Sequence, residues 1–90
     1  MIKHPSAQKR HRQSLKRRDR NQAVRSRIRT FVRHVRESIE ASDVGEATER
    51  LRRATRAIDK AVTKGVLHRN TASRKISRLT RALRALAASS

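Results

Sequence analysis

Residues 24–39 read VRSRIRTFVRHVRESI, and this stretch predicts the fold. Its large apolar side chains recur every three or four positions, the spacing of one stripe along an α-helix. Two later stretches repeat the pattern, and no part of the chain alternates with the period of a strand. The three stripes comprise Val24, Ile28, Phe31, Val32, Val35 and Ile39, then Ala47, Leu51, Ala54, Ile58, Ala61 and Val62, and finally Ala72, Ile76, Leu79, Leu83 and Leu86. We therefore expect an all-α protein.

Residues typical of helix ends separate the three stripes. Asp43, followed three residues later by Glu46, predicts a capping box at the start of the second helix. Gly65 suits the left-handed residue that follows a helix end, and Asn70 is a good N-cap for the third helix. These links are short, which favours antiparallel neighbours.

The predicted architecture is a three-helix antiparallel bundle whose long N-terminal helix extends beyond it. The bundle helices are expected over residues 24–41, 43–64 and 70–87. If residues 6–41 form one helix, it is about 54 Å long. The chain is interpreted as a single domain over 1–90, with a basic extension over 1–22 and the bundle over 23–90.

The charge is large and unevenly placed. The 90 residues include 25 Lys and Arg and 7 Asp and Glu, for a net charge of +18. Residues 1–36 have 13 basic and 1 acidic side chains (net +12), residues 37–63 have 5 and 6 (net −1), and residues 64–90 have 7 and none (net +7). Two basic segments that flank a neutral one indicate a polyanion-binding surface in two pieces.

The N-terminal segment has cations where a core stripe would continue. Extending the first stripe backwards by heptads from Val24 reaches Arg17 and then Arg10. A helix that is polar all round cannot be held by a protein core. We therefore expect this segment to be poorly ordered alone and helical when an anionic partner surrounds it.

Other cations follow the helical spacing. Arg18, Arg25, Arg29 and Arg33 form a row that we expect on the side of the first helix away from the core. In the second helix, Glu46 and Glu49 can pair with Arg50 and Arg53, so we interpret that face as solvated or protein-supporting.

Several classes of function are excluded. Without cysteine there is no disulfide framework or zinc-cysteine site, and no apolar run approaches the length of a membrane span. The four histidines, His4, His11, His34 and His68, lack metal-ligand spacing, and no hydroxyl has a partnered base. We expect a protein that is not an enzyme and that uses no cofactor, metal or small-molecule substrate.

The polyanion could be DNA, RNA, an anionic membrane or an acidic protein. Phe31 is the only aromatic residue besides the histidines, so the chain lacks base-stacking platforms and single-strand readers are not expected. A membrane-binding helix would need a broad apolar face, and a leucine zipper would need a longer unbroken stripe. Phosphate and ribose contacts by Arg and Lys suit folded RNA, but they would equally serve a protein that compacts DNA.

Two motifs carry a resemblance to a known family. They are residues 6–14 (SAQKRHRQS) with 17–21 (RRDRN) and 26–31 (SRIRTF), and residues 58–61 (IDKA) with 64–72 (KGVLHRNTA). In this order they resemble the bacterial small-subunit ribosomal protein S20 family over nearly the whole chain. The resemblance implies a three-helix bundle with an extended first helix that binds 16S ribosomal RNA directly in the body of the 30S subunit. It also implies a cytoplasmic, ribosome-bound monomer that supports subunit assembly.

Charge and resemblance together predict the RNA-binding residues. They are Lys3, Lys9, Arg10, His11, Arg12, Gln13, Lys16, Arg17, Arg18, Arg20, Asn21, Arg25, Ser26, Arg27, Arg29, Arg33, His68, Arg69, Asn70, Arg74, Lys75 and Arg78.

Overall fold

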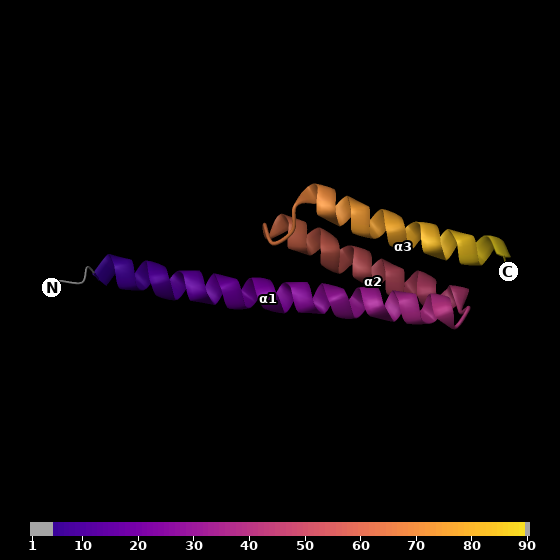
Figure 1. Ribbon diagram of the computed structural model, residues 1–90, viewed down its shortest axis with the longest axis horizontal. Coiled ribbons are helices and arrows are strands. Elements are labelled where there is room, and N and C mark those ends of the chain that lie inside the picture. The colour runs from indigo at the N-terminus through magenta and orange to yellow at the C-terminus, as the bar shows by residue number, and fades with distance from the viewer. Residues whose placement is uncertain (1–4, 90) are drawn as a thin grey trace.

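The computed structural model describes residues 5–89, with side chains from residue 7 onward. It contains three α-helices, α1 (Pro5–Glu40), α2 (Val44–Thr63) and α3 (Arg69–Ser89), and the described residues form no strand. Each helix runs antiparallel to the one before it, and all three pairs of helices are in contact (Figure 1). The predicted three-helix antiparallel bundle is confirmed.

The first helix is much longer than the other two. α1 has 36 residues, or about 54 Å of helix, against 20 in α2 and 21 in α3. Its N-terminal half projects past the ends of α2 and α3 (Figure 1), and the molecule measures 69 × 21 × 15 Å. The predicted extension of the N-terminal helix beyond the bundle is therefore confirmed.

The core lies in two neighbouring clusters that use all three helices. One is centred on Ile28 of α1 and Ile58 of α2, and the other joins Val35, Ala54 and Leu79. Every position of the three predicted stripes is buried or half-buried. The stripes are therefore the inner faces of the helices.

The turn after α2 adds a core residue that periodicity could not predict. Gly65 has φ +76°, which confirms the predicted left-handed position. Its N–H donates to the Val62 carbonyl oxygen, and the Val66 N–H donates to that of Ala61, which is the hydrogen-bond pattern of a Schellman motif. The turn returns Val66 to the first core cluster, where it is 6% exposed.

The link between α1 and α2 also has a left-handed residue after the helix end, and here that residue is a serine. Ser42 has φ +57°, and the Asp43 N–H donates to the Ser38 carbonyl oxygen. The Asp43 carboxylate accepts from the Glu46 N–H at 3.0 Å. The predicted capping box is therefore only half formed, because the Asp43 N–H is already used and the Glu46 side chain binds Arg50 instead.

The predicted N-cap of α3 is wrong. α3 begins at Arg69, so Asn70 is already inside the helix. His68 is the capping residue: its Nδ1 accepts a 3.1 Å hydrogen bond from the Asn70 N–H, and its carbonyl oxygen accepts from the Ala72 N–H. The imidazole nitrogen of His68 therefore satisfies a first-turn N–H, which is the role expected of the Asn70 side chain.

Candidate nucleic-acid interface

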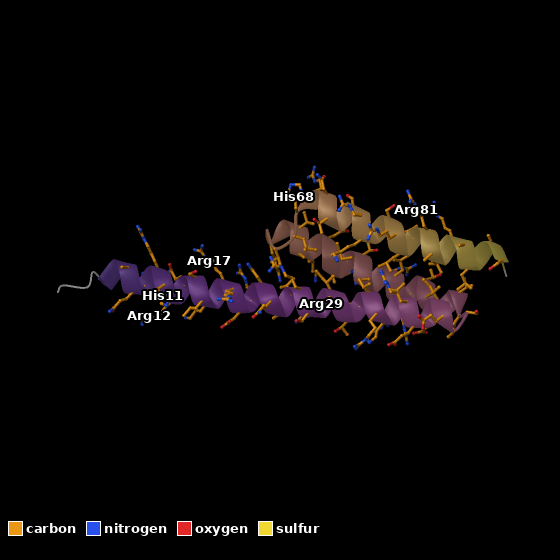
Figure 2. The ribbon with its side chains drawn as sticks, in the orientation of Figure 1. His11, Arg12, Arg17, Arg29, His68 and Arg81 are labelled. Atoms are coloured by element: carbon orange, nitrogen blue, oxygen red, sulfur yellow. The ribbon has the colours of Figure 1, made fainter. Side chains whose placement is uncertain are left out.

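The projecting half of α1 carries the densest group of predicted RNA-binding side chains. Residues 7–20 are all exposed, and none of their cations forms an ion pair with a carboxylate of the described residues. His11, Arg12 and Arg17 illustrate how these side chains surround the helix beyond the bundle (Figure 2). The predicted residues here are Lys9, Arg10, His11, Arg12, Gln13, Lys16, Arg17, Arg18 and Arg20.

Two of these arginines share a depression on the surface of α1. Arg10 and Arg17, one heptad apart, line a hollow of about 400 Å³ together with Gln13 and Ser14. The hollow thus brings two guanidinium groups, an amide and a hydroxyl together. This combination suits phosphate oxygens, because Arg donates in a planar fork and the neutral groups donate beside it.

A second basic surface lies between α1 and α3. Spacing along the sequence could not predict it, because its residues come from different helices. Arg25 and Arg29 of α1 and Lys75 of α3 line a groove of about 240 Å³ over Ile28 and Leu67. We call it the α1–α3 groove. It brings residues from both predicted basic segments to one place, so the two pieces of the predicted surface meet here.

The α1–α3 groove corrects the predicted arginine row. Arg25 Nη2 donates to the Val66 carbonyl oxygen at 3.5 Å, so Arg25 reaches the α2–α3 turn rather than pointing away from the bundle. Arg29 shares the groove with Lys75. Arg25 and Arg29 of the row therefore lie at the edge of the packed face, beside the turn after α2 and the start of α3.

The remaining predicted RNA-binding residues lie on α1, in the α2–α3 turn and on α3, apart from Lys3. Asn21 is half-buried, Arg33 forms an ion pair of 3.7 Å with Glu37, and Lys3 lies outside the described residues. Besides Arg33, the exposed ones are Ser26, Arg27, His68, Arg69, Asn70, Arg74 and Arg78.

A further basic groove was not predicted from the sequence. It lies between α1 and α2, measures about 230 Å³, and has Val24, Ile28, Phe31, Ala57 and Ala61 among its lining residues. We call it the α1–α2 groove. Five cations also line it: Arg27, Arg53, Arg56, Lys60 and Lys64.

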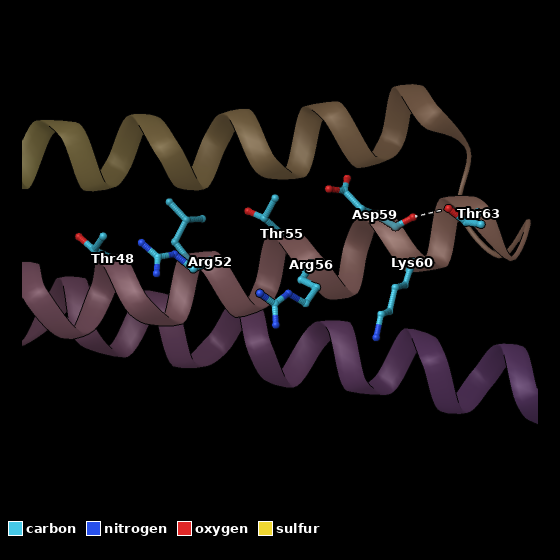
Figure 3. Close-up of a pocket in the computed structure, with 8 residues that line it drawn as sticks. Thr48, Arg52, Thr55, Arg56, Asp59, Lys60 and Thr63 are labelled. Carbon is cyan, nitrogen blue, oxygen red and sulfur yellow. Dashed lines mark hydrogen bonds between the residues drawn. The ribbon is translucent and has the colours of Figure 1, made fainter.

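Four of these cations, namely Arg53, Arg56 and Lys60 of α2 and Lys64 directly after it, were overlooked, because the near-zero net charge of residues 37–63 hid the arrangement of the first three. They stand at offsets 0, 3, 7 and 11, which is one stripe of a helix, and this spacing could have revealed them. Figure 3 shows Arg56 and Lys60 extending from α2 toward α1, whereas Asp59 extends toward α3. Asp59 does not line the α1–α2 groove, although it shares a second hollow along α2 with both cations.

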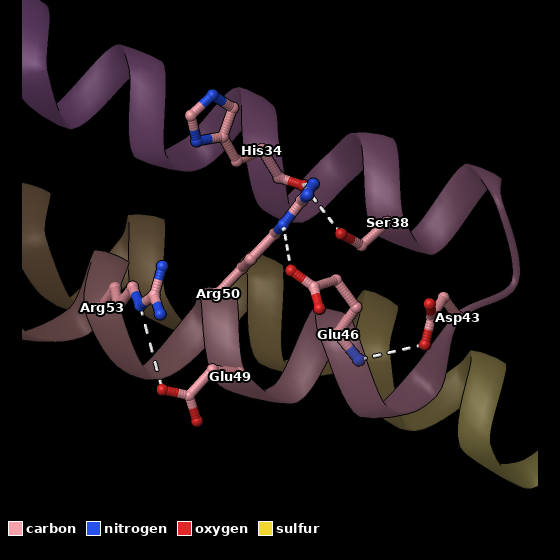
Figure 4. Close-up of polar contacts among 7 residues, drawn as sticks. All are labelled: His34, Ser38, Asp43, Glu46, Glu49, Arg50 and Arg53. Atoms are coloured by element: carbon pink, nitrogen blue, oxygen red, sulfur yellow. Dashed lines mark hydrogen bonds and ion pairs between the residues drawn. The ribbon is translucent and has the colours of Figure 1, made fainter.

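The predicted ion pairs of α2 are confirmed. Glu46 lies 2.9 Å from Arg50, and Glu49 lies 3.8 Å from Arg53 (Figure 4). Glu49 also lies 3.8 Å from Arg52. Arg52 and Arg53 are more than 60% exposed, so their pairs contribute little to stability. Both guanidinium groups therefore remain accessible to another anion.

The described residues bring together no group of three or more His, Cys, Asp or Glu side chains that could hold a metal ion. None of the described helices has an apolar stretch long enough to cross a bilayer.

Comparison with known proteins gives one consistent result. Residues 3–84 match the family model described as ribosomal protein S20. The chain is 48% identical over 86 residues to the small ribosomal subunit protein bS20 of Geobacter metallireducens, covering 96% of this chain and 99% of that protein. It is 51% identical over 87 residues to the protein of the same name from Maridesulfovibrio salexigens (97% and 100% covered), and 50% identical over 88 residues to that from Dinoroseobacter shibae (98% and 100% covered).

Proposed function

Because the chain belongs to the ribosomal protein S20 family, we propose that it binds 16S ribosomal RNA directly and supports assembly of the 30S subunit. The family makes it a structural, non-enzymatic component of the small ribosomal subunit, associated with that subunit and its RNA. In this proposal it is a cytoplasmic, ribosome-bound monomer without a small-molecule substrate.

One observation carries the proposal. The projecting half of α1 exposes seven Lys and Arg side chains over residues 9–20, with no apolar face for a protein neighbour and no ion pair with a described carboxylate. RNA phosphates supply the counter-charge that this helix lacks. Neutralising them lets RNA helices approach one another, which is how the protein supports assembly.

The basic extension over residues 1–22 is proposed to gain its stable helical form on RNA. Over residues 7–20 no side chain is buried by α2 or α3. An isolated helix of this length is marginal in water, and closely spaced cations weaken it further.

The test is the salt dependence of binding to a 16S RNA fragment. Each neutralised phosphate releases counterion, so the plot of log affinity against log salt should fall with a slope of about −0.9 per phosphate contact on a duplex. A slope near zero would contradict the proposal. In a competition at matched salt, folded 16S RNA should displace duplex DNA, and equal affinities would favour a DNA-compacting role instead.

A further inference from the structure

The α1–α2 groove combines an apolar floor with a basic rim. Val24 and Phe31 of α1 and Ala57 of α2 contribute to the floor, and all three are only half-buried. Phe31 is the only Phe in a chain without Trp or Tyr. Phe31 is therefore the only aromatic ring, apart from the histidine imidazoles, that could stack on a base, and it lines an open groove on the surface of the bundle.

The rim has charge of one sign. Arg27 of α1 lines the groove together with Arg53, Arg56 and Lys60 of α2 and Lys64 directly after it, and none of the lining residues is acidic. The one ion pair on the rim, Arg53 with Glu49, is long at 3.8 Å and exposed. Cations that line one groove repel one another, so an anion between them lowers the free energy of the complex.

The size of the groove limits its occupant. Sites for drug-sized ligands usually enclose about 300–1,000 Å³, whereas this groove encloses about 230 Å³. Its volume is small for a helix of a protein partner, and its floor is too apolar for a phosphate alone. A single flat ring flanked by two phosphates matches both the floor and the rim.

We propose that the α1–α2 groove receives one unpaired nucleotide of the bound RNA. Its base lies against Phe31 and Val24, and the phosphates on either side contact Arg27, Arg53 and Lys64. This inference rests on the proposed RNA-binding function and adds a base-accepting site to a surface otherwise made of phosphate contacts. It gives the protein a preference for RNA helices with a bulged nucleotide.

The test compares two RNA hairpins that differ only in one unpaired adenosine in the stem. Base–aromatic stacking of ordinary strength predicts about fivefold or greater preference for the bulged hairpin. Because Phe31 is the only Phe in a chain without Trp or Tyr, its ring signals in an NMR spectrum are distinct from those of the four histidines. They should shift when the bulged hairpin is added and stay in place with the fully paired hairpin.

Arg53→Gln and Arg52→Gln form a matched pair of variants. The two arginines are adjacent, each pairs with Glu49 at 3.8 Å, and each substitution removes one charge. Of the two, only Arg53 lines the α1–α2 groove, whereas Arg52 lines a second hollow along α2 that shares Arg56 and Lys60 with the groove. Arg53→Gln should reduce the preference for the bulged hairpin, and Arg52→Gln should leave it unchanged, with helix content checked by circular dichroism.

The outcomes separate this inference from the proposed function. Equal affinity for the two hairpins with unmoved Phe31 signals would overturn the base site and leave RNA binding intact. An equal effect of the two arginine substitutions on the preference would also overturn it. Failure to bind either hairpin at low salt would overturn the proposed function together with this site.

Discussion

Arg50 Nη1 donates a 3.0 Å hydrogen bond to the main-chain carbonyl oxygen of His34, so a side chain of α2 is tied to the backbone of α1. The Ser38 hydroxyl donates to the same oxygen at 3.1 Å (Figure 4). Arg50 Nε also donates to the Glu46 carboxylate at 2.9 Å, which orients the guanidinium. This arginine is therefore a structural cation, unlike the exposed arginines around it.

Replacing Arg50 by Ala should lower the free energy of unfolding by about 1–2 kcal/mol, because a charged donor is removed from a half-buried carbonyl oxygen. The control is Arg53→Ala, whose exposed pair should contribute no more than about 0.5 kcal/mol. Urea unfolding followed by circular dichroism measures both. Equal losses of stability would show that the Arg50–His34 bond does not stabilise the packing of α1 on α2.

The two glycines should respond to alanine with opposite signs. Gly45 lies in the first turn of α2, where an added Cβ would meet only Asp43 Oδ1 at 3.8 Å, so Gly45→Ala should stabilise by up to about 1 kcal/mol. Gly65 has φ +76° and open space around it, so Gly65→Ala should destabilise by about 1–2 kcal/mol through backbone conformation alone. Thermal unfolding of the two variants should shift the midpoint in opposite directions.

Two leucines provide a matched test of the core. Leu79 is 3% exposed in the second core cluster, and Leu79→Ala should destabilise the fold by about 2–5 kcal/mol. Leu15 is 46% exposed on the projecting half of α1, and the same substitution there should change stability by less than about 0.5 kcal/mol. A large decrease in stability at Leu15 would mean that the projecting half packs against protein.

The double variant Arg10→Ala, Arg17→Ala should weaken binding to a 16S RNA fragment and reduce the salt slope by about 0.9 for each phosphate that the protein no longer neutralises. Its unfolding free energy should stay near that of the wild type, because both side chains are exposed outside the bundle. The control is the double variant Arg36→Ala, Arg52→Ala, which also removes two positive charges but from exposed arginines outside the predicted site. A decrease in stability with unchanged binding would contradict the interpretation.

Hydrogen exchange should show that the projecting half of α1 depends on RNA. In the RNA-free protein we expect the amides of residues 7–20 to exchange rapidly, and those around Val35 and Ile58 to be protected. Binding to a 16S RNA fragment should then slow exchange over residues 7–20. Full protection of these amides without RNA would contradict the prediction.

Local rules predicted the elements of this fold well and their ends less well. The apolar stripes depend on spacing along one helix, and the Gly65 turn depends on the residue type at a helix end, so both can be predicted from the sequence. The start of α3 could not be predicted in this way, because a ring nitrogen of His68 takes the capping role that was expected of the Asn70 side chain. Val66 was missed because it becomes a core residue only once Gly65 has turned the chain back.

The sequence by itself determined the three helices, their buried faces, the charge of the two basic segments and the likeness to a ribosomal family. Only the tertiary structure decided which cations share a groove: Arg25 with Lys75 on one side of α1, and Arg27 with Arg53 on the other. The reason is that helical periodicity orients side chains within one helix. The distance between side chains on different helices depends on the register of the two helices and on the faces through which they pack. Both are set by the packing of the whole core.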